Sequence, residues 1–260
     1  MRLWNRALIV VSGCFCLLTA CTSTSEMRLT PSQLEIGRQL YISRQYTKTL
    51  HYLRPLVQKN PEDVRALKLL ANTYLAIGHR KSARKYYRAA LKVDPKNHDL
   101  RIAYAYALIL SKKYATARNQ LRKIHKTKEY PFPEWIYNNF GLSYLQQKRY
   151  KKAALFFKKA LELDPTLAIA HFNLGMCFAK EKRWTKASES FQRASNFCPG
   201  CAEPTFELAK SYVRRGKEKE AEIALQKLLK QKTNHRIRVR TRKMLKWVRQ
   251  RRGAENSVRR

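Results

Sequence analysis

Small, aromatic and apolar residues recur along the chain in units of about 34 residues, at spacings typical of helix faces. Three segments carry the order alanine, aromatic residue, alanine and proline, separated by four, three and five residues: Ala83, Tyr87, Ala90 and Pro95; Ala153, Phe157, Ala160 and Pro165; Ala187, Phe191, Ala194 and Pro199. Upstream of each lies another helical stretch with an apolar-small pair and an aromatic residue: Leu70-Ala71 and Tyr74; Phe140-Gly141 and Tyr144; Leu174-Gly175 and Phe178. Small residues let two helices approach closely, the aromatic ring fills the space beside them, and the proline ends the second helix. The pattern predicts repeated helical hairpins.

Extending this register predicts six hairpins, at residues 30–63, 64–97, 98–133, 134–167, 168–201 and 202–235. Five are 34 residues long, and the third has two extra residues around Pro131 and Pro133. A final helix from about Arg236 to Arg251, within a basic segment 236–260, has one apolar face and is expected to cap the array: Ile237, Met244, Leu245 and Val248. The positions resemble the signature of tetratricopeptide repeats. The predicted fold class is therefore all-α, a tetratricopeptide-repeat superhelical solenoid of six helical hairpins plus a C-terminal capping helix.

The first residues of the chain have the features of an export signal. Arg2 and Arg6 form a basic start, and residues 7–18 are an apolar stretch too short to cross a bilayer as a stable helix. The stretch ends in small residues followed by Cys21, which resembles the lipobox cut by the lipoprotein signal peptidase. We expect residues 1–20 to be a lipoprotein signal peptide, and the alternative is an ordinary secretory signal with a coincidental cysteine.

Lipidation of Cys21 would make the membrane a partner of the protein through N-terminal acyl chains. Several acyl chains anchor a protein stably, whereas one chain binds only marginally. In enteric bacteria an aspartate after the lipidated cysteine retains a lipoprotein in the inner membrane, and this chain has Thr22 there. The expected location is therefore the periplasmic face of the outer membrane, with residues 21–29 as lipidated cysteine and tether.

The chain is strongly basic, with 55 lysines and arginines against 18 acidic residues and a formal net charge of +37. Such a charge implies an anionic neighbour, which could be nucleic acid, acidic lipid or cell-wall polymer, or an acidic protein. The export signal argues against nucleic acid. The basic face of the final helix is either simply solvated or a specific contact for an acidic surface.

Cysteine use fits an oxidising compartment. Two of the six cysteines lie in the predicted signal peptide and Cys21 is predicted to be lipidated, which leaves Cys177, Cys198 and Cys201. We expect a disulfide between Cys198 and Cys201, in the turn between the fifth and sixth hairpins; unpaired thiols, a redox role or metal binding are the alternatives. A four-ligand zinc site would need a second cysteine pair that the sequence does not have.

Catalytic motifs are absent from the sequence. None of the six histidines lies in an H-E-x-x-H motif, and there is neither a G-x-S-x-G elbow nor a G-x-x-x-x-G-K-[ST] loop. The chain is therefore expected to be a binding protein, neither an enzyme nor the holder of a cofactor or metal.

The first helices of such hairpins line a concave face, on which the second, fifth, ninth and twelfth positions of each helix face a bound peptide. Lys68 and Asn72, with Arg65, resemble part of the carboxylate clamp of cochaperones, but Ala103 and Trp135 replace two of its polar residues. Elsewhere the face is apolar and aromatic, which favours a protein segment as ligand, although some of these residues are expected to pack between repeats. The predicted partner-binding groove comprises Trp135, Asn138, Leu142, Phe172, Met176, Tyr106, Phe206, Lys68 and Asn72.

The whole arrangement resembles the PilF/PilW/Tgl family of type IV pilus pilotins, outer-membrane lipoproteins with six tetratricopeptide repeats. The most specific element is Tyr130-Pro131-Phe132-Pro133-Glu134 before the fourth repeat, which resembles a Tyr-Pro-x-Pro-Glu stretch of these pilotins. The resemblance implies that the protein carries secretin subunits to the outer membrane and promotes their multimerisation. The alternative is a lipid-anchored adaptor that docks peptidoglycan enzymes.

Overall fold

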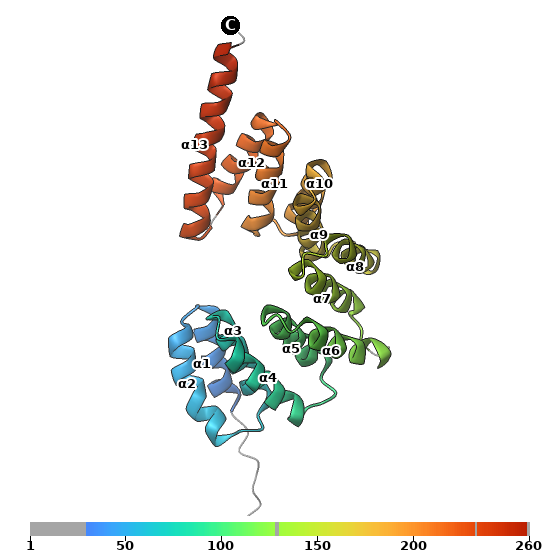
Figure 1. Ribbon diagram of the computed structural model, residues 1–260. Helices are drawn as coiled ribbons and strands as arrows, with labels where there is room; N and C mark the ends of the chain where they lie inside the picture. The colour runs from blue at the N-terminus through green and yellow to red at the C-terminus, as the bar shows by residue number, and fades with distance from the viewer. Residues whose placement is uncertain (1–29, 128–129, 232, 259–260) are drawn as a thin grey trace, which may run out of the picture.

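The computed structural model describes residues 30–127, 130–231 and 233–258, and these residues form thirteen α-helices and no strands (Figure 1). The first helices of the six hairpins are α1 (Pro31–Ile42), α3 (Val64–Ala76), α5 (His98–Leu110), α7 (Pro133–Gln146), α9 (Ala168–Lys180) and α11 (Ala202–Arg214). The second helices are α2 (Tyr46–Lys59), α4 (Arg80–Val93), α6 (Tyr114–Thr127), α8 (Tyr150–Leu163), α10 (Trp184–Phe197) and α12 (Glu218–Lys230), and α13 (His235–Val258) follows. The all-α fold class is confirmed. The predicted signal peptide, Cys21 and the tether lie outside the described residues.

The helices of each hairpin approach closely where the sequence has a small residue. A Cβ atom added to Gly141 on α7 would lie 2.6 Å from the ring of Phe157 on α8, and one added to Gly175 on α9 would lie 2.7 Å from the ring of Phe191 on α10. Both rings are completely buried. Glycine is therefore required at these crossings by the close approach of the helices, as the sequence pattern predicts.

Each hairpin turn contains one residue with a left-handed backbone. These residues are Arg44, Gly78, Lys112, Lys148, Lys182 and Gly216. Their spacing follows the repeat, including the two extra residues of the third hairpin. The turn geometry therefore belongs to the repeat itself, and it is kept even where a lysine or arginine must adopt a conformation that favours glycine.

The two extra residues lie in the connection from α6 to α7. The Tyr130 hydroxyl donates a hydrogen bond to Asp99 Oδ1 at 2.8 Å, which ties this connection to the start of α5. Helix α7 begins at Pro133, one residue before the predicted start of the fourth repeat at Glu134, and the spacing of the repeat is as predicted. A proline at the first position of a helix loses no hydrogen bond, which explains the earlier start.

Helix α13 packs against α12 and α11 at the end of the array. Its buried face includes Ile237, Leu245 and Val248, as expected for a cap. The helix starts at His235, one residue before the predicted boundary, and continues to Val258, beyond the expected end near Arg251. None of the helices in the described ranges is long and apolar enough to span a membrane.

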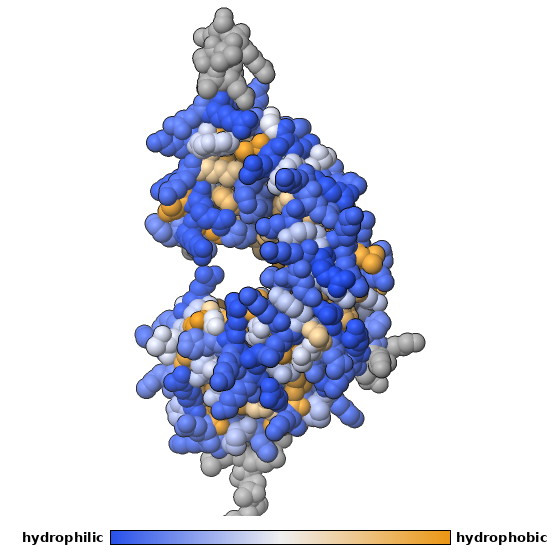
Figure 2. Space-filling model, in the orientation of Figure 1, coloured by the Kyte–Doolittle hydropathy of each residue, from blue (hydrophilic) through white to orange (hydrophobic). Residues whose placement is uncertain are grey.

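Stacked hairpins give the molecule a curved shape. The first helices of neighbouring hairpins contact one another, α1 with α3, α5 with α7 and α7 with α9, and α11 contacts α13 in the same way. Figure 1 shows α5 and α7 on the inner side of the curve and α6 and α8 on the outer side. The space-filling view is hollowed where the N-terminal and C-terminal halves face each other (Figure 2). The first helices thus line a concave surface.

Candidate functional site

Two half-exposed aromatic residues of the predicted groove lie on consecutive first helices. Tyr106 on α5 and Trp135 on α7 are each 40% exposed. Tyr106 is the ninth residue of its repeat and Trp135 the second, both positions that face the groove. Large, half-exposed aromatic side chains on a concave protein surface are typical anchor points for a partner.

Three further residues of the predicted groove are half-buried, because they pack against the core beneath the concave surface. Phe172 and Met176 on α9 and Leu142 on α7 pack against the core cluster that includes Phe157 and Phe191. The ring centroids of Phe172 and Phe191 are 5.7 Å apart. These side chains are therefore partly available to a ligand and partly committed to the junction between repeats four and five.

Asn138 has a different place from the one predicted. Its side chain is only 5% exposed, and Asn138 Oδ1 accepts a hydrogen bond from Asn173 Nδ2 at 3.1 Å. This buried bond joins α7 to α9, so Asn138 fixes the relation of two first helices beneath the surface. We assign it a positioning role and leave it out of the set of contact residues.

Phe206 is likewise withdrawn from the groove. It is 6% exposed, and the Arg240 guanidinium carbon of α13 lies 4.3 Å from its ring centroid. The predicted groove included Phe206 because its position faces the concave side in every earlier repeat. Helix α13 covers that position in the sixth repeat. The repeat pattern alone does not show this burial, because it depends on how α13 packs.

The resemblance to a carboxylate clamp is weakened by contacts within the chain. Asn72 Oδ1 accepts a hydrogen bond from the Tyr87 hydroxyl, and Arg65 forms an ion pair with Asp63 at 3.0 Å. Burial raises the pKa of Tyr87, and the neighbouring phenols of Tyr41 and Tyr106 raise it further, so the hydroxyl keeps its proton. Lys68 is half-buried on the same helix. Asn72 and Arg65 are therefore engaged in structural contacts.

Cys198 and Cys201 are bonded to each other in the structure, with their Cα atoms 5.3 Å apart. Cys198 directly follows α10 and Cys201 directly precedes α11, so the bond closes the turn between the two hairpins. Gln231 Nε2, after α12, donates a hydrogen bond to the Pro199 carbonyl in the same turn at 3.0 Å. Cys177 is buried, and burial raises the pKa of its thiol to about 12, which makes it a poor nucleophile.

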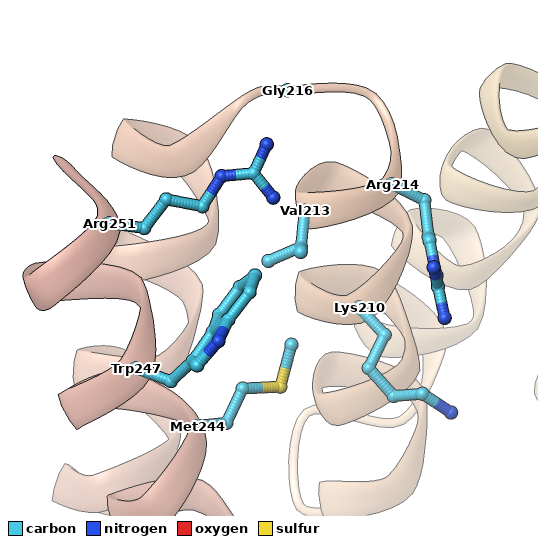
Figure 3. A pocket seen from close by; sticks show the side chains of 7 residues that line it. All are labelled: Lys210, Val213, Arg214, Gly216, Met244, Trp247 and Arg251. Atoms are coloured by element: carbon cyan, nitrogen blue, oxygen red, sulfur yellow. The ribbon is translucent and has the colours of Figure 1, made fainter. Parts of the chain in front are cut away.

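Two features of the surface did not emerge from the sequence analysis. One is a group of cations around Tyr144, whose ring centroid lies 4.8 Å from both the Arg118 guanidinium carbon and Lys152 Nζ. The other is a pocket between α11 and α13, with Trp247 in its wall (Figure 3). The repeat spacing was a usable signal for the pocket, because Val213 and Trp247 are 34 positions apart. No group of histidines, cysteines and carboxylates suited to a metal ion occurs among the residues that the structure describes.

Comparison with known protein families identifies the repeats. Models of the tetratricopeptide repeat match residues 64–107 and 135–167. Among curated proteins, the type IV pilus assembly protein PilF of Pseudomonas aeruginosa is 29% identical over 141 residues, which cover 53% of this chain and 55% of PilF. The chain therefore aligns with about half the length of this curated relative.

Solved structures show the same architecture. PilW, a widely conserved type IV pilus biogenesis factor, superposes with a TM-score of 0.63 at 16% identity, over 76% of this chain and 91% of PilW. PilF of Pseudomonas aeruginosa gives a TM-score of 0.58 at 19% identity, over 82% of this chain and 96% of PilF. A tetratricopeptide repeat protein from Parabacteroides merdae gives 0.68 at 12% identity, over 83% and 82% of the two chains. The chain is a tetratricopeptide solenoid, part of its sequence is similar to PilF, and such solenoids typically serve as scaffolds for protein interactions.

Proposed function

We propose that this protein is an outer-membrane pilotin, a lipid-anchored scaffold that binds a type IV pilus secretin subunit on its concave surface and promotes its multimerisation. The observation that carries the proposal is the pair of half-exposed aromatic residues, Tyr106 and Trp135, on consecutive first helices of a pilus-related solenoid. The similarity to PilF and PilW supports a role in pilus assembly, and the groove chemistry supports a protein segment as ligand.

The physical argument for the groove rests on rigidity and partial burial. Tyr106 and Trp135 project from α5 and α7, which share a buried apolar cluster that includes Ala105, Ile136 and Phe140. Aromatic side chains held in this way lose little conformational entropy on binding and bury a large apolar area. A partner segment that lies along α5, α7 and α9 would gain most of its affinity from these two residues.

The deciding experiment replaces both aromatic anchors. A Tyr106→Ala, Trp135→Ala double variant should keep its helical circular dichroism and thermal melting, yet lose secretin multimers in membranes of cells that make pili. Each truncation is expected to cost about 2 kcal/mol of binding free energy at a buried contact. Ile223→Ala, at a 65% exposed position on α12, is the matched control and should assemble normally. Normal multimers in the double variant would exclude the groove as the secretin site.

The proposed anchor is Cys21 with a short tether. Eight residues, 22–29, separate it from the first repeat, and such a segment spans at most about 28 Å when extended. The concave surface would thus work close to the membrane. Replacing Cys21 with serine should abolish acyl labelling and release the protein from the outer-membrane fraction, and unchanged fractionation would refute lipid anchoring.

The second candidate function is a lipid-anchored adaptor for cell-wall enzymes, which the basic face of α13 favours. Exposed cations on this helix, among them Arg236, Arg242 and Lys246, could lie against acidic lipid or cell-wall polymer. Contacts between exposed charges weaken steeply with salt, whereas burial of aromatic groups does not. Partner binding that collapses at high salt and ignores the Trp135 truncation would favour the adaptor.

A further inference from the structure

The pocket between α11 and α13 has an apolar wall and a basic rim. Val213 from α11 and Met244 and Trp247 from α13 face one another across it, as the close-up shows (Figure 3). The cavity measures about 430 Å³, which is room for one large side chain and the backbone that carries it. Trp247 is 45% exposed, so its ring lines the cavity and is only partly buried by neighbouring side chains.

This pocket extends the concave surface to the end of the solenoid. Lys210 and Val213 occupy the ninth and twelfth positions of the sixth repeat, and Met244 and Trp247 follow each of them by 34 residues. Helix α13 thus occupies the place of a seventh first helix. Its groove-facing positions carry an exposed tryptophan, whereas its opposite face buries Val248 and Leu245. A cap that only covered the core would not need a half-exposed tryptophan there.

The rim of the pocket is cationic. Lys210, Arg214 and Arg251 surround the apolar wall, and none of the residues that line the pocket is acidic. Lys210 Nζ pairs with Glu207 of the same helix at 2.6 Å, and Arg251 pairs with Glu218 of α12 at 3.4 Å. These carboxylates hold the two cations in place from outside the pocket. The Arg214 guanidinium carbon lies 5.8 Å from the Trp184 ring centroid.

We propose that this pocket is a second binding site, which takes a short acidic segment of a partner protein that presents one large apolar side chain between carboxylates. The apolar side chain would enter between Trp247 and Val213, and the flanking carboxylates would meet the cations of the rim. A flat membrane fits poorly, because the pocket opens on the concave positions of the helices. The site is independent of the groove at Tyr106 and Trp135.

The test uses a matched pair of fluorescein-labelled peptides and the full-length protein in detergent. One peptide has a central phenylalanine flanked by glutamates and aspartates, and the other has alanine in place of the phenylalanine. Fluorescence anisotropy should show that the phenylalanine peptide binds about tenfold more tightly or better. The alanine peptide reports the attraction that any acidic peptide feels for a chain of charge +37.

Two variants locate the site. Trp247→Ala should lower the affinity for the phenylalanine peptide by about tenfold, to the affinity measured for the alanine peptide. Its affinity for the alanine peptide should stay unchanged. Arg214→Glu, an exposed change that leaves the apolar wall intact, should weaken the phenylalanine peptide and reduce its salt dependence. Trp135→Ala and Ile223→Ala should bind both peptides normally, which separates this proposal from the groove. Circular dichroism should show all four variants folded.

Three results would overturn the proposal. Equal affinity for the two peptides would mean that only charge is recognised. An unchanged affinity of both Trp247→Ala and Arg214→Glu for the phenylalanine peptide would place binding elsewhere. Binding to phosphatidylglycerol vesicles that Trp247→Ala abolishes, with no preference between the peptides, would make the membrane the ligand.

Discussion

The middle of the solenoid is held by apolar packing, whereas its C-terminal end adds ion pairs to the apolar contacts of α13. In repeats four and five, glycines on α7 and α9 bring the helices onto completely buried phenylalanines of α8 and α10. At the end, Arg249 and Arg252 of α13 reach Glu222 of α12, the first at 2.8 Å. Burial of apolar rings is insensitive to salt and acid, whereas exposed ion pairs respond to both. The middle is therefore suited to hold a rigid groove, and the end can loosen without disturbing it.

The largest expected effect concerns the buried phenylalanines of the middle. Phe157→Ala should lower the free energy of unfolding by about 3–5 kcal/mol, because it leaves a cavity beneath Gly141. Gly141→Ala should be destabilising as well, because its Cβ would meet the Phe157 ring at 2.6 Å. Thermal unfolding followed by circular dichroism measures both.

Gly200→Ala is the matched control for Gly141→Ala, since nothing lies within 4 Å of a Cβ there. It should melt like the unmodified protein. A Gly141→Ala variant as stable as this control would mean that the close helix crossing is not a constraint.

The disulfide lies at the boundary between the two regions and should have an intermediate effect. A Cys198→Ser, Cys201→Ser double variant should lose at most about 2 kcal/mol, because the closed loop is short and its chain entropy small. Thiol labelling of the denatured, unreduced mature protein should modify Cys177 alone. Full labelling of all three thiols would show that the bond does not form.

The ion pairs at the end should contribute less, and only above acidic pH. Hydrogen bonding from Arg249 and the charge of Arg252 lower the pKa of Glu222 below its ordinary value. A carboxylate with a lowered folded-state pKa stabilises the protein above its unfolded-state pKa, and this contribution is lost as pH falls through the lowered pKa. Helix α13 should therefore loosen in acid before α9 does.

Hydrogen exchange of α13 amides, compared with α9 amides at the same pH, measures this loosening. Glu222→Gln should speed hydrogen exchange of the α13 amides at neutral pH. The change in the free energy of opening of the helix should be about 1 kcal/mol or less. Glu220→Gln, which removes a more exposed pair with Lys217, should change little. Equal protection of α13 in Glu222→Gln and in the unmodified protein would show that apolar packing alone holds the cap.

The smallest effect concerns the hairpin turns. In the middle, Lys148 and Lys182 adopt left-handed backbones with φ near 60°, whereas the last hairpin has Gly216 with φ 67° at the equivalent place. Lys148→Gly should stabilise the protein by up to about 1 kcal/mol, since the left-handed conformation costs an L-residue about that much. Gly216→Ala should be destabilising by a similar amount. Melting temperatures of the two variants test this prediction. A lower melting temperature for Lys148→Gly would show that the flexibility of glycine in the unfolded chain outweighs the relief of the left-handed conformation.

Much of the architecture could be predicted because similar residue types recur at the same structural positions in successive repeats. Small residues opposite aromatics, prolines at helix ends and a constant period specify hairpins whose contacts are with near neighbours in sequence. The first helices begin within one residue of the expected repeat starts, and α13 continues beyond its expected end near Arg251.

The candidate site was predictable only in part, and the reason is again physical. The sequence by itself determined which positions face the concave side, and Tyr106 and Trp135 are exposed there as expected. Only the tertiary structure decided that Asn138 is used in a bond to Asn173, that Phe206 is covered by Arg240, and that Trp247 stays open. Periodicity specifies the direction of a side chain from its own helix. Its exposure depends on how the neighbouring helix packs, and beside α11 that neighbour is α13.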